Sequence, residues 1–146
     1  MILFSILIAI IAGFAPMVVY ALIVWWFDRY EKEPWPLLVV VFVWGAVPSI
    51  ILALIFELIL DIPIKSLVEG GLAYNLLGSS VIAPIIEEFF KGLAVLGVLL
   101  VFYRQFDDVM DGIVYGSIVG FGFAAVENVL YFLSALDQSG AGSMLV

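Results

Sequence analysis

The chain has 146 residues, of which 66% are hydrophobic and 12% are charged, and its net charge at pH 7 is −8. Its mean hydropathy of +1.28 predicts an integral membrane protein, because soluble domains are only about half apolar. The net negative charge argues against a nucleic-acid partner, because binding to nucleic acid requires basic patches on the protein. The sequence has no cysteine and no histidine, so disulfides are excluded and the commonest metal ligand is missing.

Four apolar runs divide the chain, and each approaches or exceeds the about 20 residues that a spanning helix needs. The first run lacks the basic start of a cleaved signal peptide, so we interpret it as a retained span. Glu57 lies near the edge of the second run and is expected to extend to the interface, without a functional role. Asp61, Lys65 and Glu69 then recur at helical spacing, which is typical of a short interfacial segment. The sequence therefore predicts one all-α domain over 1–146, a polytopic membrane bundle of about four transmembrane helices with spans at residues 2–27, 36–60, 74–103 and 109–136.

The distribution of Lys and Arg predicts the orientation, because cytoplasmic loops of membrane proteins carry an excess of these residues. Arg29 and Lys32 follow the first run and Arg104 follows the third, whereas the second loop has Lys65 and the termini have none. We therefore expect the first and third loops in the cytoplasm and both termini outside.

Three charged side chains interrupt the third run at "IIEEFFKGLAV", residues 85–95. Ionisable groups inside a membrane are costly and are functional by default. Glu87 and Lys91 share one helix face, and Glu88 lies about 100° further round the axis. A structural ion pair buried between helices, or a break in the helix that admits water, is the alternative interpretation of these residues.

A second acidic position lies in the fourth run, at Glu127 followed by Asn128. Asp107 lies twenty residues after Glu87 and twenty before Glu127, and each arm of a hairpin that turns there rises about 1.5 Å per residue. Glu87, Glu88 and Glu127 are therefore expected at nearly the same depth, facing one another. Three buried carboxylates cannot all be ionised at low cost, and one that exchanges a proton near neutral pH is a usable general base. Interhelical hydrogen bonding is the alternative role for Glu127 and Asn128.

Glycines predict where the last two helices touch. Gly112, Gly116 and Gly120 recur at every fourth position, which is typical of tightly packed membrane helices. We expect this row to pack against the third run, where Gly92 and Gly97 offer matching small residues.

Four motifs together resemble those of the PrsW-type intramembrane proteases, which are relatives of the CAAX-processing and bacteriocin-processing membrane proteases. They occur in the family's order as "DRYEKEP" after the first run, "EEFFK" in the third, "DDVMDGIVYG" before the fourth and "GFGFAAVEN" within it. The resemblance implies a multi-pass protein in the plasma (inner) membrane of a prokaryote. It also implies a peptide-bond hydrolase that cuts a membrane-anchored regulatory protein such as an anti-sigma factor.

The same resemblance implies catalytic roles for residues of two motifs. Glu87 and Glu88 would activate the attacking water, and Lys91 would help to set their charge. Glu127 would supply the second motif, and Asn128 would donate a hydrogen bond to the developing oxyanion.

Substrate contacts are implied for Phe123, which begins the FxxxE motif, and for Asp111, which with Asp108 matches a third acidic patch. A structural role is the alternative for these two aspartates. Asp111 lies about four turns of helix away from Glu127. We therefore expect Asp111 near the cytoplasmic surface, outside the cluster of acids.

The chain departs from the family's pattern in one respect. The wider family carries a further span with an HxxxD-type motif, whereas this sequence has no histidine. The chain is then either the front part of a longer protein or a variant without that motif. Relatives have been grouped with metalloproteases, which leaves a divalent metal such as zinc open. Glutamates alone are a poor zinc site, so we expect a metal-free, glutamate-based mechanism without a cofactor.

Two other functions fit the same residues. Buried acids paired with lysine also serve the proton relays of proton- or cation-coupled transporters, although no inverted repeat of the transporter kind is visible. The second alternative function is that of a non-catalytic membrane scaffold that descended from such a protease. For the leading hypothesis, the expected partners are the lipid bilayer and a membrane-anchored protein substrate.

Overall fold

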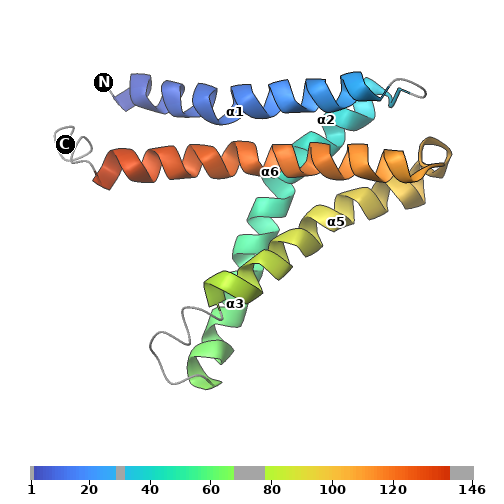
Figure 1. The fold of residues 1–146 in the computed structure, drawn as a ribbon. Helices are drawn as coiled ribbons and strands as arrows, with labels where there is room; N and C mark the ends of the chain where they lie inside the picture. The colour runs from blue at the N-terminus through green and yellow to red at the C-terminus, as the bar shows by residue number, and fades with distance from the viewer. Residues whose placement is uncertain (1, 29–31, 68–77, 139–146) are drawn as a thin grey trace.

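A computed structural model describes residues 2–28, 32–67 and 78–138. These residues form helices and helical turns without a strand, which confirms the all-α fold class. α1 and α6 lie side by side and antiparallel, α2 and α3 cross them, and α5 diverges from α6 (Figure 1). The elements in chain order are α1 (Ile2–Phe27), α2 (Trp35–Trp44), the π-helical turn η1 (Gly45–Ser49), α3 (Ile50–Leu67), the π-helical turn η2 (Gly78–Ile82), α5 (Ala83–Val101), the 3-10 turn η3 (Tyr103–Gln105) and α6 (Val109–Gln138).

Three helical stretches are long and apolar enough to cross a membrane, namely Leu3–Phe27, Trp35–Leu60 and Val109–Leu136. They correspond to the first, second and fourth expected spans, and the molecule is an all-α membrane bundle. α5 has 19 residues and differs from these stretches because it carries three charged side chains. The expected third span begins outside the described residues.

Prolines account for the two π-helical turns. Proline lacks the N–H that would bond to the carbonyl four residues earlier, and its ring clashes with that carbonyl. A local widening of the helix relieves the clash. Pro48 lies inside η1, and Pro84 follows η2 at the start of α5. The second expected span is therefore one helical path with a π-helical turn in its middle.

The expected interfacial segment lies only partly within the described residues. α3 continues as a helix to Leu67, so residues 61–67 prolong the helix that carries the second span, and the interfacial position of the segment stays a prediction. Glu69, the last charged residue of that segment, lies outside the described residues.

Helix backbones approach each other closely at two glycines in the middle of the molecule. A Cβ atom at Gly45 would overlap the carbonyl of Val119, and one at Gly122 would overlap the carbonyl of Phe42. The backbones of α2, η1 and α6 therefore touch here, and only glycine fits at either position.

The predicted packing of the glycine row on α6 against α5 is wrong. Because α5 diverges from α6 beyond the turn that joins them (Figure 1), the two rows of small residues do not meet. A Cβ atom added at Gly112 would meet the Phe106 ring at 3.2 Å. Within the described part of the chain, no atom outside the local helix would lie within 4 Å of a Cβ atom at the other four predicted glycines, namely Gly92, Gly97, Gly116 and Gly120.

Two hydrophobic clusters set the position of α5. The larger joins α5 to α2 and α6 near the turn that connects α5 with α6, and the smaller joins α5 to α3 near the start of α5. The acids of α5 lie in the region between α3 and α6. The buried residues of the larger cluster are Leu37, Leu38, Val41, Ala94, Val98, Val114, Tyr115, Ile118 and Val119, and those of the smaller are Ala53, Ile86 and Phe90.

Candidate active site

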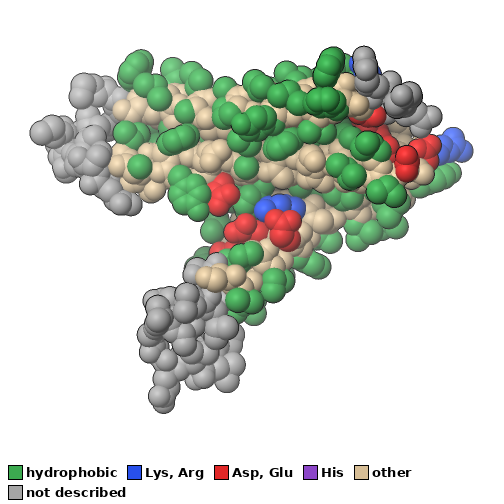
Figure 2. All heavy atoms as spheres, in the orientation of Figure 1, with side chains coloured by type: hydrophobic (Ala, Val, Ile, Leu, Met, Phe, Trp, Pro, Cys, Tyr) green, Lys and Arg blue, Asp and Glu red, His purple; other side chains and the backbone are tan. Residues whose placement is uncertain are grey.

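A cavity of about 230 Å³ lies between α3, α5 and α6. Three carboxylates line it, one from each helix: Glu57 from α3, Glu87 from α5 and Glu127 from α6. Acidic and basic side chains gather in the notch where α5 and α6 diverge (Figure 2). The remaining lining is mostly apolar and consists of Ile50, Ala53, Leu54, Phe123, Leu130 and Tyr131. The cavity therefore combines acid–base groups with a mostly apolar lining.

The prediction that Glu87 and Glu127 face one another is confirmed, since both line this cavity. The two residues are forty positions apart in the sequence. The turn at residues 102–108 folds the chain back, and the constant rise of the two helices brings the acids to the same level.

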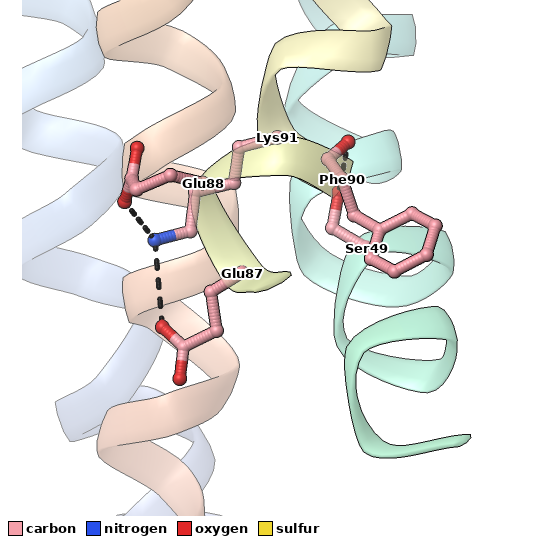
Figure 3. A network of polar contacts seen from close by, with 5 residues as sticks. All are labelled: Ser49, Glu87, Glu88, Phe90 and Lys91. Carbon is pink, nitrogen blue, oxygen red and sulfur yellow. Dashed lines mark hydrogen bonds and ion pairs between the residues drawn. The ribbon is translucent and has the colours of Figure 1, made fainter. Parts of the chain in front are cut away.

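Lys91 connects the acids of α5 to α6. Its Nζ atom lies 2.6 Å from Oε1 of Glu88 and 3.7 Å from Oε2 of Glu87 (Figure 3). The same ammonium group lies 4.0 Å from the centre of the Phe123 ring on α6. Only 17% of the Lys91 side chain is exposed, so its charge is held in place by these three neighbours.

Glu88 has a different environment from the one expected. Its side chain is 72% exposed. Glu88 is not one of the described residues that line the cavity between α3, α5 and α6. Adjacent residues on a helix point about 100° apart, so Glu88 points away from the cavity when Glu87 points into it. The link of Glu88 to the site is its ion pair with Lys91.

The carbonyl of Phe90 anchors α5 next to these charges. The Ser49 hydroxyl donates a hydrogen bond to this carbonyl over 3.3 Å (Figure 3). Nε1 of Trp44 donates a second hydrogen bond to the same carbonyl over 3.1 Å. Ser49 is fully buried and lies in the π-helical turn η1. The turn caused by Pro48 thus supplies a contact that holds the charged part of α5 against the second span. Sequence reasoning missed Ser49, and its only signal is a hydroxyl beside a proline in an apolar run.

Asn128 is half-buried, and within the described part of the chain it is not one of the residues that line the cavity. Its role as an oxyanion donor stays a prediction. Tyr131, one turn beyond Glu127, does line the cavity, and its hydroxyl interacts with the Glu127 carboxylate.

Asp111 lies apart from the cavity, as the sequence predicts. Sixteen residues of α6 separate it from Glu127, or about 24 Å along the helix. Its Oδ2 atom accepts hydrogen bonds from the backbone N–H groups of Asp107, at 2.8 Å, and Asp108, at 2.9 Å. Asp111 therefore closes the turn that precedes α6, and its predicted substrate contact is not tested by this arrangement.

A second acidic group surrounds Glu33, which sequence reasoning did not single out. The Tyr115 hydroxyl donates a hydrogen bond to the Glu33 carboxylate, and the Glu33 backbone N–H donates to Oδ2 of Asp28 over 3.4 Å. Glu33, Asp28 and Asp111 are all buried. Burial raises the pKa of Glu33 to about 7, the Tyr115 hydrogen bond opposes this change, and the negative charges of Asp111 and Asp28 add to it.

The described residues do not fit a resident zinc ion. Among them, no three His, Cys, Asp or Glu side chains cluster closely enough to hold a metal. The cavity offers carboxylate oxygens only, whereas catalytic zinc sites in proteins include nitrogen or sulfur ligands. The chemistry available from these residues is therefore that of carboxylates, an ammonium group and a phenol.

Comparison with known proteins gives a consistent result. Residues 33–146 match the family described as PrsW family intramembrane metalloprotease. Protease PrsW of Clostridioides difficile is 34% identical over 107 residues, which cover 73% of this chain and 43% of the relative. Protease PrsW of Geobacillus kaustophilus is 33% identical over 84% of this chain and 51% of the relative, and that of Bacillus subtilis is 32% identical over 84% and 52%. The chain thus spans about half the length of these curated relatives. No solved structure matches the chain.

Proposed function

The chain belongs to the PrsW family of intramembrane proteases, and we propose that it carries the catalytic centre of an intramembrane endopeptidase. The observation that carries this proposal is the cavity in which Glu87 and Glu127 face one another beside Lys91. Peptide hydrolysis inside a membrane requires a polar site that admits water and is closed to lipid. A cavity of about 230 Å³ has room for several water molecules, each of which occupies about 30 Å³ in the liquid.

In the proposed reaction, Glu87 is the general base. Its carboxylate takes a proton from a water molecule in the cavity, and the water oxygen attacks the carbonyl carbon of the scissile peptide bond. General base catalysis of this kind contributes a rate factor of about 10²–10⁴. Lys91 compensates the negative charge of Glu87 and keeps the carboxylate oriented, and Glu88 holds Lys91 from the other side. Asn128 is the proposed donor to the oxyanion.

The proposed substrate is a membrane-anchored protein with a single span, such as an anti-sigma factor. The apolar lining of the cavity suits an apolar segment, and the divergence of α5 from α6 leaves the charged notch open at the surface (Figure 2). Backbone groups of a spanning segment are paired within its helix. The substrate must therefore unwind locally before its carbonyl reaches Glu87.

The proposed mechanism is metal-free, because the described residues of the cavity supply carboxylates without a nitrogen or sulfur ligand for zinc.

Co-expression of the chain with a panel of single-span regulatory proteins tests the proposal. Cleavage of at least one member by the wild-type chain is expected, together with loss of that cleavage in Glu87→Gln. Asp107→Asn is the matched control, because Asp107 is an exposed carboxylate in the turn before α6 and lies outside the cavity. Equal cleavage by the wild-type chain and Glu87→Gln would overturn the proposal.

A further inference from the structure

We propose that Glu57 is the general acid of this cavity and delivers a proton to the nitrogen of the departing peptide segment. The inference rests on the proposed function and adds a third carboxylate to it. It begins from the position of Glu57, which lines the same cavity as Glu87 and Glu127 although it comes from a different helix.

The packing of α3 against α5 fixes Glu57 in the cavity. Ala53, one turn before Glu57, is buried against α5 and also lines the cavity. Phe56, the residue next to Glu57, packs edge-on against Phe90 with ring centres 5.0 Å apart. These contacts hold the turn of α3 that precedes Glu57 against α5, and so they place the Glu57 side chain at the cavity that it lines.

The neighbours of the three carboxylates assign different roles to them. Glu87 has the ammonium group of Lys91 at 3.7 Å, and Glu127 has the hydroxyl of Tyr131 beside it. A cation and a hydrogen-bond donor both suit an ionised carboxylate. Among the described side chains, no cation or hydrogen-bond donor partners Glu57.

An unpaired charge in a largely apolar cavity is costly, and a protonated carboxyl group is the cheaper form of Glu57. A site that holds one ionised and one protonated carboxyl has both members of an acid–base pair. Glu87 is then the base, and Glu57 is the acid that faces it across the cavity.

The proposed step balances without a further reactant. Water transfers one proton to the Glu87 carboxylate as its oxygen bonds to the carbonyl carbon. The bond between that carbon and the peptide nitrogen then breaks, and the nitrogen receives the proton of Glu57. The products are a carboxylic acid and an amine, and transfer of the proton from Glu87 to Glu57 restores both groups.

The pH dependence of kcat in proteoliposomes that hold the full chain and a cleaved single-span substrate tests this role. A bell-shaped profile is expected for the wild-type chain, because the base must be ionised and the acid protonated. Glu57→Gln should lower kcat about 10²- to 10⁴-fold and remove the fall in rate on the alkaline side. Co-purification of the substrate should be unchanged, since the amide keeps the size of the side chain.

Two further variants separate the possible outcomes. Glu57→Asp keeps a carboxyl group and should retain the alkaline fall at a reduced rate, so it decides the question if Glu57→Gln does not insert. An Asp variant without that fall would overturn the role of Glu57. Wild-type kcat and profile in Glu57→Gln, with an inactive Glu87→Gln, would overturn the role of Glu57 alone. Full activity in Glu87→Gln would instead overturn the proposed function.

Discussion

The ammonium group of Lys91 on α5 lies 4.0 Å from the centre of the Phe123 ring on α6. This contact joins the two motifs that supply Glu87 and Glu127, and it crosses the edge of the cavity that they line. Cation–π pairs that are shielded from water contribute about 2 kcal/mol. The relative position of the two acids therefore depends partly on an aromatic ring at position 123.

Replacement of that ring should weaken cleavage. We expect Phe123→Leu to lower kcat about tenfold, which corresponds to about 1.4 kcal/mol, because Lys91 loses one of its three contacts. Phe123→Tyr keeps the aromatic face and should remain within about threefold of wild type. Cleavage of the single-span substrate in proteoliposomes measures both. Equal rates for the leucine variant and the wild-type chain would show that the ring does not position Lys91.

The close crossing at Gly122 predicts a sharp difference between two glycines of α6. A Cβ atom at Gly122 would overlap the backbone carbonyl of Phe42, whereas one at Gly120 meets no described atom within 4 Å. We expect Gly122→Ala to reduce the free energy of unfolding by about 2 kcal/mol or more. Gly120→Ala should be neutral or stabilise by up to about 1 kcal/mol through helix propensity. Denaturation in detergent by SDS compares the two, and equal effects would contradict the described crossing.

The buried carboxyl of Glu33 predicts that stability depends on pH. Its pKa of about 7 lies above the ordinary value of 4.5, so between these values the folded state binds more protons than the unfolded state. Stability should therefore be highest at or below about pH 4.5, fall as the pH rises to about 7, and stay low above it. The total change is on the order of 3 kcal/mol.

Glu33→Gln removes the titrating group and keeps an oxygen that accepts the Tyr115 hydrogen bond. The variant should lose this fall and should be more stable than the wild-type chain above pH 7. Unfolding temperatures in detergent between pH 4.5 and pH 8 measure the effect, with Asp107→Asn as a control that retains the wild-type profile. Parallel profiles for Glu33→Gln and the wild-type chain would contradict the assigned environment.

Treatment with a chelator tests the metal-free mechanism. The described residues offer no cluster that could hold a metal, so we expect dialysis against a chelator to leave the cleavage rate unchanged. The rate is measured before and after dialysis and again after zinc is added. Strong inhibition that zinc reverses would show that the mechanism uses a metal.

Sequence reasoning was most successful where local geometry decides the outcome. Glu87 and Glu127 lie at equal distances in sequence from the loop that joins their helices. Because the rise per residue of a helix is nearly constant, this spacing predicts that they lie at the same depth. The same reasoning did not separate Glu88 from Glu87, although the rotation of about 100° between neighbours contains that information. Pro48 marked the interruption of the second span, but its form as a π-helical turn, with Ser49 directed at Phe90, depends on contacts with α5.

Contacts between distant segments could not be predicted in this way. The sequence places Glu57 at the membrane edge, because its own apolar run does not indicate which helices pack against it. The glycine row of α6 satisfied a packing pattern, yet the approach of α2 and η1 uses Gly122, which lies outside the row. Glu33 and Tyr115 are 82 residues apart, and the sequence around either residue does not indicate that the two form a hydrogen bond.

The rate of substrate cleavage by Glu87→Gln in proteoliposomes tests the central claim most directly. The variant replaces the proposed base by an amide of the same size, so insertion and substrate binding should persist while kcat falls by a factor of about 10²–10⁴. Asp107→Asn, measured in parallel, should match the wild-type chain. A Glu87→Gln chain that inserts and cleaves at the wild-type rate would contradict the account.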